Sequence, residues 1–182
     1  MGECALQFQI NAQKADGTIE SIGTKDIWVK GNQCKTTLTT PQVVQTFLFN
    51  TQLDKATITK DIGQSHFLQT INYPPVSKVN LVAQELIDTN STIHILGYRC
   101  KALQLKWSDG SIYDILYTNE LSLTVNQFEL AFQNIPGLVL SYTISAANGL
   151  RINYQATKLD LSPLSLSLFT INNELYQAID EK

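Results

Sequence analysis

Hydrophobic and polar residues alternate along much of the chain. Near its start, Leu6, Phe8 and Ile10 alternate with glutamine and asparagine residues. The same period of two recurs at 128–132, 138–144 and 150–156. This period places successive side chains on opposite faces of a β-strand. The four stretches therefore predict strands with one face in a hydrophobic core and the other in water.

Turn-forming dipeptides separate the apolar runs. They are Asp16-Gly17, Gly31-Asn32, Asp109-Gly110 and Asn148-Gly149. Asparagine, aspartate and glycine accept the positive φ angles that tight hairpin turns require. Because strands joined by such short turns run antiparallel, the sequence predicts a sheet built largely from consecutive hairpins.

One segment has a different spacing. Over 74–88 the apolar residues recur at intervals of three and four, which is typical of an amphipathic helix. We predict a helix there, with Val76, Val79, Val82 and Leu86 on its apolar stripe. A shorter helical or 3₁₀ turn is expected near Leu164–Phe169.

These elements predict a mainly β (α+β) fold in one domain over 1–182. About ten strands are too many to stay flat, because strand twist accumulates across a sheet. We expect a single strongly curved antiparallel sheet, an open half-barrel, with the 74–88 helix packed on its concave side as a lid. The residues predicted to line a hydrophobic cavity under this lid are Phe128, Leu130, Phe132, Leu140, Tyr142, Ile152 and Tyr154.

Composition and charge exclude several classes of protein. The chain has 182 residues, of which 43% are hydrophobic and only 16% charged, with a net charge of −3. A nucleic-acid-binding protein presents a basic patch, so we expect no nucleic-acid partner. No apolar run approaches the roughly 20 residues that cross a bilayer, so no transmembrane segment is predicted.

The sequence offers little for catalysis, and we expect neither an enzyme nor a bound cofactor or metal. Cys4, Cys34 and Cys100 contain no C-x-x-C pair and lie far in sequence from His66 and His94. If His94 and Cys100 share one strand, they lie about 20 Å apart, too far for a nucleophile and its base. A Cys34–Cys100 disulfide and burial of both as free thiols are alternatives, of which burial is favoured.

The second half of the chain carries short elements in a familiar order. They are Gly97-Tyr98-Arg99-Cys100-Lys101-Ala102, a Ser-Asp-Gly hairpin, Tyr117-Thr118, Asn134-Ile135-Pro136-Gly137-Leu138-Val139, Ala156-Thr157-Lys158-Leu159-Asp160 and Ser167-Leu168-Phe169. Together they resemble the GLPGLI-type secreted bacterial proteins, with Asn134 at the first glycine of the naming motif. This family is similar in architecture to the LolA/LolB lipoprotein carriers.

The resemblance implies a half-barrel around an apolar cavity, in the periplasm or at the outer membrane, after removal of a signal peptide. It implies hydrophobic-ligand binding and supplies no catalytic residues. We therefore expect a non-catalytic binding or carrier protein for an acyl chain, a lipid or a lipid-modified peptide. The alternative is an envelope protein-interaction or scaffold module with a solid core and no ligand cavity.

Overall fold

The computed structural model describes residues 2–14, 16–74, 79–88, 92–123, 129–146 and 149–179. Within these ranges, thirteen strands form one open sheet with the order β13-β6-β5-β4-β3-β2-β1-β12-β11-β10-β9-β7, and β8 pairs with β9. All neighbouring strands run antiparallel except β13, which is parallel to β6. The predicted antiparallel sheet is thus confirmed.

The strands of the first half are β1 (Glu3–Gln13), β2 (Ile19–Lys30), β3 (Gln33–Thr39), β4 (Val44–Asn50), β5 (Lys55–Ile62), β6 (Ser65–Asn72) and β7 (Leu81–Ile87). Those of the second half are β8 (Ile93–Ile95), β9 (Tyr98–Trp107), β10 (Ile112–Thr118), β11 (Leu138–Ser145), β12 (Arg151–Asp160) and β13 (Gln177–Ala178). Three short 3₁₀ turns are described, η1 (Leu130–Phe132), η2 (Leu166–Phe169) and η3 (Asn173–Leu175).

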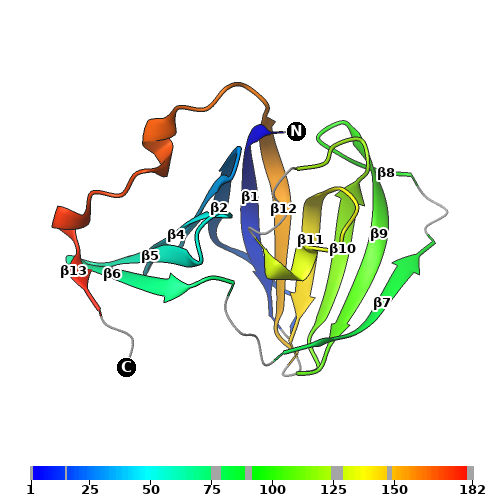
Figure 1. Ribbon diagram of the computed structural model, residues 1–182. Helices are drawn as coiled ribbons and strands as arrows, with labels where there is room; N and C mark the ends of the chain where they lie inside the picture. Colours follow the sequence, from blue (N-terminus) through cyan, green and yellow to red (C-terminus); the bar gives the residue numbers. More distant parts are fainter. Residues whose placement is uncertain are drawn as a thin grey trace.

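The sheet is bent into two arms that meet at β1 and β12 (Figure 1). One arm carries β3 to β6, and the other carries β11, β10, β9 and β7. The register shifts between Gln7 and Phe8 where β1 pairs with β12, and again between Ile10 and Asn11 where β1 pairs with β2. Such irregularities bend a strand and increase its local twist, which fits their position in the central strand.

The core lies on the inner face of this bend. In β1, Cys4, Leu6, Phe8 and Ile10 are all buried, while the residues between them are only partly buried. Cross-strand partners point to the same side of a sheet, so the pairs Leu6–Ile27 and Phe8–Lys25 extend this inner face onto β2. The alternation in the sequence therefore places one apolar surface along the concave side of the sheet at β1 and β2.

The predicted helix over 74–88 is wrong. Residues 75–78, including Val76, lie outside the described residues, but 81–87 form the edge strand β7 and no helix packs on the sheet in the part of the chain that the structure describes. Every residue of β7 is exposed, so both faces of the strand are open. The predicted α+β class, with its lid helix, is corrected to an almost all-β fold.

The segment that covers the concave face is the connection between β10 and β11. Its described residues Leu123, Phe132 and Ile135 are all buried and belong to the core cluster. Leu130–Phe132 form the 3₁₀ turn η1, so the strand predicted at 128–132 is also wrong there, and Phe128 lies outside the described residues. Pro136-Gly137 ends this segment and leads into β11.

The C-terminal arm crosses one end of the sheet from β12 to β13 (Figure 1). Lys30 donates to the Glu3 carboxylate and to the Leu164 carbonyl, both at 2.8 Å, and the Leu164 amide donates to Glu3, also at 2.8 Å. This network fixes the start of the arm against β1 and β2. The predicted short turn is confirmed as η2, where the Ser165 side chain accepts from the Ser167 amide.

Candidate functional site

A buried ammonium group lies on the concave face. Lys25 stands on β2 in line with Ile27 and Val29, and its side chain is 10% exposed. Its Nζ donates to Glu129 Oε2 at 2.5 Å and to Tyr142 Oη at 3.1 Å. Glu129 belongs to the β10–β11 connection and is 30% exposed. The ion pair therefore joins this connection to the sheet beneath it.

An aromatic cluster surrounds the ammonium group. Tyr142 and Tyr154 are cross-strand partners on β11 and β12, and their rings stack with centroids 4.3 Å apart. Lys25 Nζ lies 5.6 Å and 5.7 Å from these two ring centroids, within the range of cation–π attraction. Phe8 and Phe132 meet Tyr142 edge-on at 5.9 Å and 4.9 Å. The rings and the carboxylate together compensate the cost of burying a positive charge.

The phenols of this cluster stay neutral over a wide pH range. Burial raises the pKa of Tyr142 well above its usual value of 10.0, and the nearby Glu129 carboxylate raises it further. The pKa values of Tyr154 and Tyr113 are raised, also chiefly by burial. Tyr142 therefore offers Lys25 a neutral hydroxyl, which can accept the ammonium proton's hydrogen bond and still donate one of its own.

A pocket of about 180 Å³ opens beside the Lys25–Glu129 pair. Its other walls are Thr36, Leu38, Gln45, Phe47 and Tyr154. The Thr36 hydroxyl is buried, and it lacks a strong acceptor among the described residues, since its polar neighbour is the Cys34 thiol. Beyond the pocket, Phe47, Phe49 and Tyr73 pack with ring centroids 4.6 to 5.4 Å apart. The pocket thus has a polar end and an aromatic and aliphatic wall.

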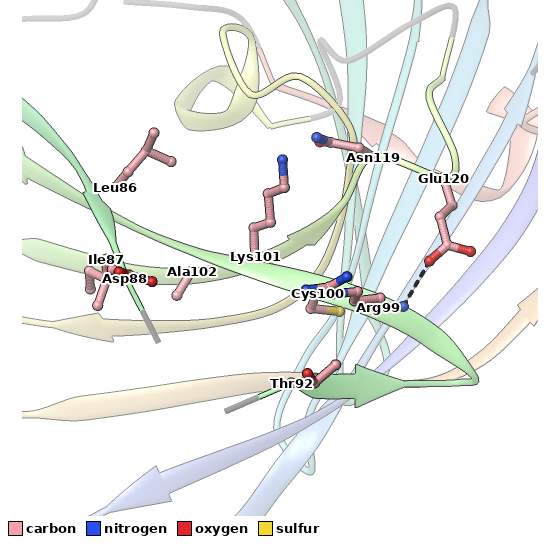
Figure 2. Close-up of a pocket in the computed structure, with 10 residues that line it drawn as sticks. All are labelled: Leu86, Ile87, Asp88, Thr92, Arg99, Cys100, Lys101, Ala102, Asn119 and Glu120. Carbon is pink, nitrogen blue, oxygen red and sulfur yellow. Dashed lines mark hydrogen bonds between the residues drawn. The ribbon is translucent and has the colours of Figure 1, made fainter. Parts of the chain in front are cut away.

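A larger groove of about 640 Å³ lies toward the opposite edge of the sheet, where β7 ends (Figure 2). Leu86, Ile87 and Ala102 supply its apolar wall, and Lys101 and Glu120 are among its charged residues. The Glu120 carboxylate accepts from the Arg99 backbone amide at 3.0 Å. The size falls in the range of small-molecule sites, whereas that of the smaller pocket suits only a headgroup or a fragment of a ligand.

The Asn119 amide joins this groove to the β10–β11 connection. Oriented so that both of its ends are satisfied, the amide donates to the Pro136 carbonyl at 2.8 Å and accepts from Lys101 Nζ at 3.0 Å. The connection is therefore anchored near its middle, at Glu129, and near its end, at Pro136. Asn119 and Glu120 of this segment line the larger groove, and Glu129 lines the smaller pocket.

The structure brings together several of the residues predicted to line a cavity. Leu140, Tyr142 and Phe132 are buried, and Ile152 and Tyr154 are partly buried. Tyr142 contacts both Phe132 and Tyr154, whereas Phe128 and the side chain of Leu130 lie outside what the structure describes.

The predicted lid residues have a different position. Val79 precedes β7, while Val82 and Leu86 lie on this edge strand and are 67% and 68% exposed. Among the predicted lid residues that the structure describes, Leu86 alone lines one of these two cavities, the larger groove. Leu86 lines the groove as part of the edge strand β7 and not as part of a lid helix.

The two charged residues at the centre of the site were not predicted from the sequence. Lys25 occupies an inward position of β2, in an alternating run that continues with Ile27 and Val29. A charged residue at such a position indicates a buried ion pair or a binding site. Glu129 stands between Phe128 and Leu130, again an acid in an apolar setting. The two residues are 104 positions apart, so the hydrophobic pattern around either one does not indicate that they pair.

The histidines and cysteines are placed apart from this site. His94 and Cys100 lie on paired strands, so the premise of one shared strand was wrong, but His94 is opposite Arg99 while Cys100 is opposite Ile93. Adjacent residues of a strand point to opposite faces, so the imidazole and the thiol are directed apart. Within the described residues, His, Cys, Asp and Glu side chains form no group of three or more that could hold a metal ion.

The three cysteines are buried free thiols, as favoured from the sequence. Burial raises the pKa of Cys4 to about 11 and that of Cys34 to about 12. A thiol at these values is almost entirely protonated at neutral pH and is a poor nucleophile.

No protein-family model matches the chain, and no curated protein sequence matches it. The GLPGLI-type assignment therefore stays a prediction. Among the described residues, no helix is long and apolar enough to cross a membrane.

Solved structures do match. The protein PNGF-II, solved in space group P21, aligns with the whole of this chain at a TM-score of 0.55 and 15% sequence identity. The chain spans about a third of that structure, 32% of its length, so the likeness is one of fold. The LolA superfamily protein NE2245 from Nitrosomonas europaea aligns over 93% of this chain and 90% of its own, with a TM-score of 0.42 and 11% identity.

Proposed function

We propose that this protein is a non-catalytic binding or carrier protein for a hydrophobic ligand, such as an acyl chain, a lipid or a lipid-modified peptide. The observation that carries the proposal is the apolar inner face of the bent sheet, which is covered by a chain connection and not by a second sheet or a helix in the described residues. The location in the bacterial envelope rests on the sequence resemblance described above.

The mechanism is transfer of apolar surface from water into the hollow of the sheet. Each methylene group that leaves water contributes roughly 0.8 kcal/mol, so a long acyl chain needs few polar contacts. Partly buried side chains beside the core, such as Phe47, Tyr113 and Tyr154, offer surface that a ligand can still cover. The smaller pocket opens beside Phe47 and Tyr154 and is where the ligand would enter.

Native mass spectrometry of the protein expressed in a bacterial host, with lipid extraction in parallel, tests this function. We expect a co-purified or added lipid at one or two molecules per chain. Leu38→Trp fills the smaller pocket from β3 and should weaken binding, whereas Lys158→Trp on the exposed side of β12 should not. A chain that binds no lipid, before or after delipidation and reloading, would contradict the proposal.

A second function is favoured by the free edge at β7. This strand ends the sheet and exposes Leu81, Val82, Leu86 and Ile87, and an exposed apolar edge strand is a template for pairing with another chain. The protein would then be an envelope interaction module whose partner adds an extended segment to β7.

Charged side chains on an edge strand oppose such pairing. The variant Val82→Lys/Leu86→Lys should therefore lose partner capture from envelope extract. Ile19→Lys/Leu166→Lys, which adds the same two charges at exposed leucine and isoleucine positions elsewhere, should retain it. Equal capture by both variants rules out edge pairing at β7.

A further inference from the structure

The Lys25 ammonium has more hydrogen-bonding capacity than the described residues use. A lysine ammonium carries three N–H donors. Glu129 Oε2 and Tyr142 Oη accept two of them, and no third acceptor is found among the described residues. The group lines the smaller pocket, so its remaining capacity is available to a molecule that enters there.

A second donor without a strong acceptor lines the same pocket. The Thr36 hydroxyl comes from the neighbouring strand β3, is buried, and has the weakly accepting Cys34 thiol beside it. A buried hydroxyl without a strong acceptor is unfavourable, and the acceptor group of a ligand would remove this cost. A cation and a hydroxyl that converge on one small pocket form a site for an acceptor with negative charge.

The Glu129 carboxylate occupies the position in which such an acceptor would bind. Its carboxylate is the group that pairs with Lys25, yet it comes from the β10–β11 connection and is three times as exposed as the lysine, 30% against 10%. A ligand carboxylate has the same charge, size and geometry as this side chain. It can therefore take over the ion pair without leaving the buried Lys25 charge uncompensated, which would be strongly unfavourable.

The walls of the pocket are suited to the apolar tail of such a ligand. Leu38 and Phe47 line the pocket itself, and Phe49 and Tyr73 lie against Phe47. With a volume of about 180 Å³, the pocket accommodates a carboxylate and a few carbons, while the rest of a chain would leave it past Phe47 and Tyr154, which are only partly buried.

We propose that the ligand is an anionic amphiphile with a terminal carboxylate, a fatty acid by chemical class, and that Lys25 and Thr36 are its headgroup anchors in place of Glu129. This inference rests on the proposed binding function and narrows it from any apolar chain to a charged one. A neutral chain of equal length would gain the same apolar burial but no ion pair with Lys25.

The test compares laurate with 1-dodecanol as competitors of the neutral fluorescent probe N-phenyl-1-naphthylamine at pH 8. Wild-type protein should release the probe at a laurate concentration at least about tenfold below that of dodecanol, which is the size expected of a charge-assisted hydrogen bond. Lys25→Met should abolish this preference. Glu129→Gln should increase it several-fold, because the competing carboxylate is gone. The exposed Lys14→Met serves as the control and should leave the preference unchanged.

Thr36→Val keeps the shape of the side chain and removes only the hydroxyl. It should reduce laurate affinity a few-fold and leave dodecanol affinity unchanged, which gives a second readout if Lys25→Met fails to fold. Equal affinity for laurate and dodecanol in wild type and Thr36→Val would overturn the anchor assignment and leave hydrophobic binding intact. Failure of the protein to bind the probe or either competitor would overturn both proposals.

Discussion

Lys25 and Glu129, 104 positions apart in the chain, form the ion pair that ties the β10–β11 connection to the inner face of the sheet. The lysine sits among aromatic rings, with the Tyr142 hydroxyl as its other hydrogen-bond partner in the described residues. The pair is therefore a structural contact of the covering segment as well as a candidate ligand site.

Removing only one charge of this pair should destabilise the protein. Glu129→Gln leaves the Lys25 ammonium buried without its carboxylate, and we expect a loss of about 1–3 kcal/mol in the free energy of unfolding, below the fully buried case because Glu129 is partly exposed. The double variant Lys25→Met/Glu129→Met should recover part of this loss, since no buried charge remains. Urea unfolding of both variants measures the difference, and a double variant less stable than Glu129→Gln would contradict this account.

Replacing Gly137 should disturb the junction between the connection and β11. A Cβ on this residue would lie 2.1 Å from the Thr118 carbonyl oxygen at the end of β10, and that atom belongs to the backbone. Gly137→Ala therefore forces the two strand ends apart, at a cost of about 1–3 kcal/mol by the measure of overpacked cores. Gly2→Ala, where a Cβ meets nothing within 4 Å, is the control. Thermal unfolding of the two variants compares them, and equal midpoints would contradict the close approach.

The alternation of the sequence predicted the central strand β1 well, because one of its faces is buried in the core and the other is only partly buried. Leu6, Phe8 and Ile10 are buried as this pattern requires. It failed at β7, where Val79, Val82 and Leu86 have helical spacing. An edge strand with both faces exposed has no burial to impose a period of two, and only its pairing with β9 makes it a strand. The Lys25–Glu129 pair was missed for a related reason, since it depends on how a loop crosses the folded sheet.

Alkaline pH should destabilise the protein through its buried thiols. In the folded state the pKa of Cys4 is raised to about 11 and that of Cys34 to about 12, from an ordinary value of 9.0. Between pH 9 and 11 the unfolded chain releases these protons and the folded chain retains them, so the unfolded state is favoured as pH rises. Each thiol contributes a loss that approaches about 1.4 kcal/mol per pH unit within this window and is small below pH 8.

Urea unfolding at pH 8.0, 9.0, 9.5 and 10.0 measures this slope. The variant Cys4→Ala/Cys34→Ala removes both thiols and should show a flatter dependence than wild type between pH 9 and 10. If the free energy of unfolding had the same pH dependence in the two proteins, the alkaline loss of stability would come from groups other than these thiols.

Lysine substitutions on β7 distinguish the edge strand from a helix packed on the sheet. A helix with Val82 and Leu86 on its apolar stripe would bury both residues, and a charge at either position would then be strongly destabilising. In the structure the two side chains are 67% and 68% exposed, so Val82→Lys and Leu86→Lys should each change the free energy of unfolding by no more than about 0.5 kcal/mol. Leu103, the β9 residue opposite Leu86, is 1% exposed, and Leu103→Ala should cost about 2–5 kcal/mol. Large losses of stability in both lysine variants would mean that another part of the protein covers β7. Small losses in these variants beside a large loss in Leu103→Ala are the result expected of an edge strand whose outer side is open to a partner.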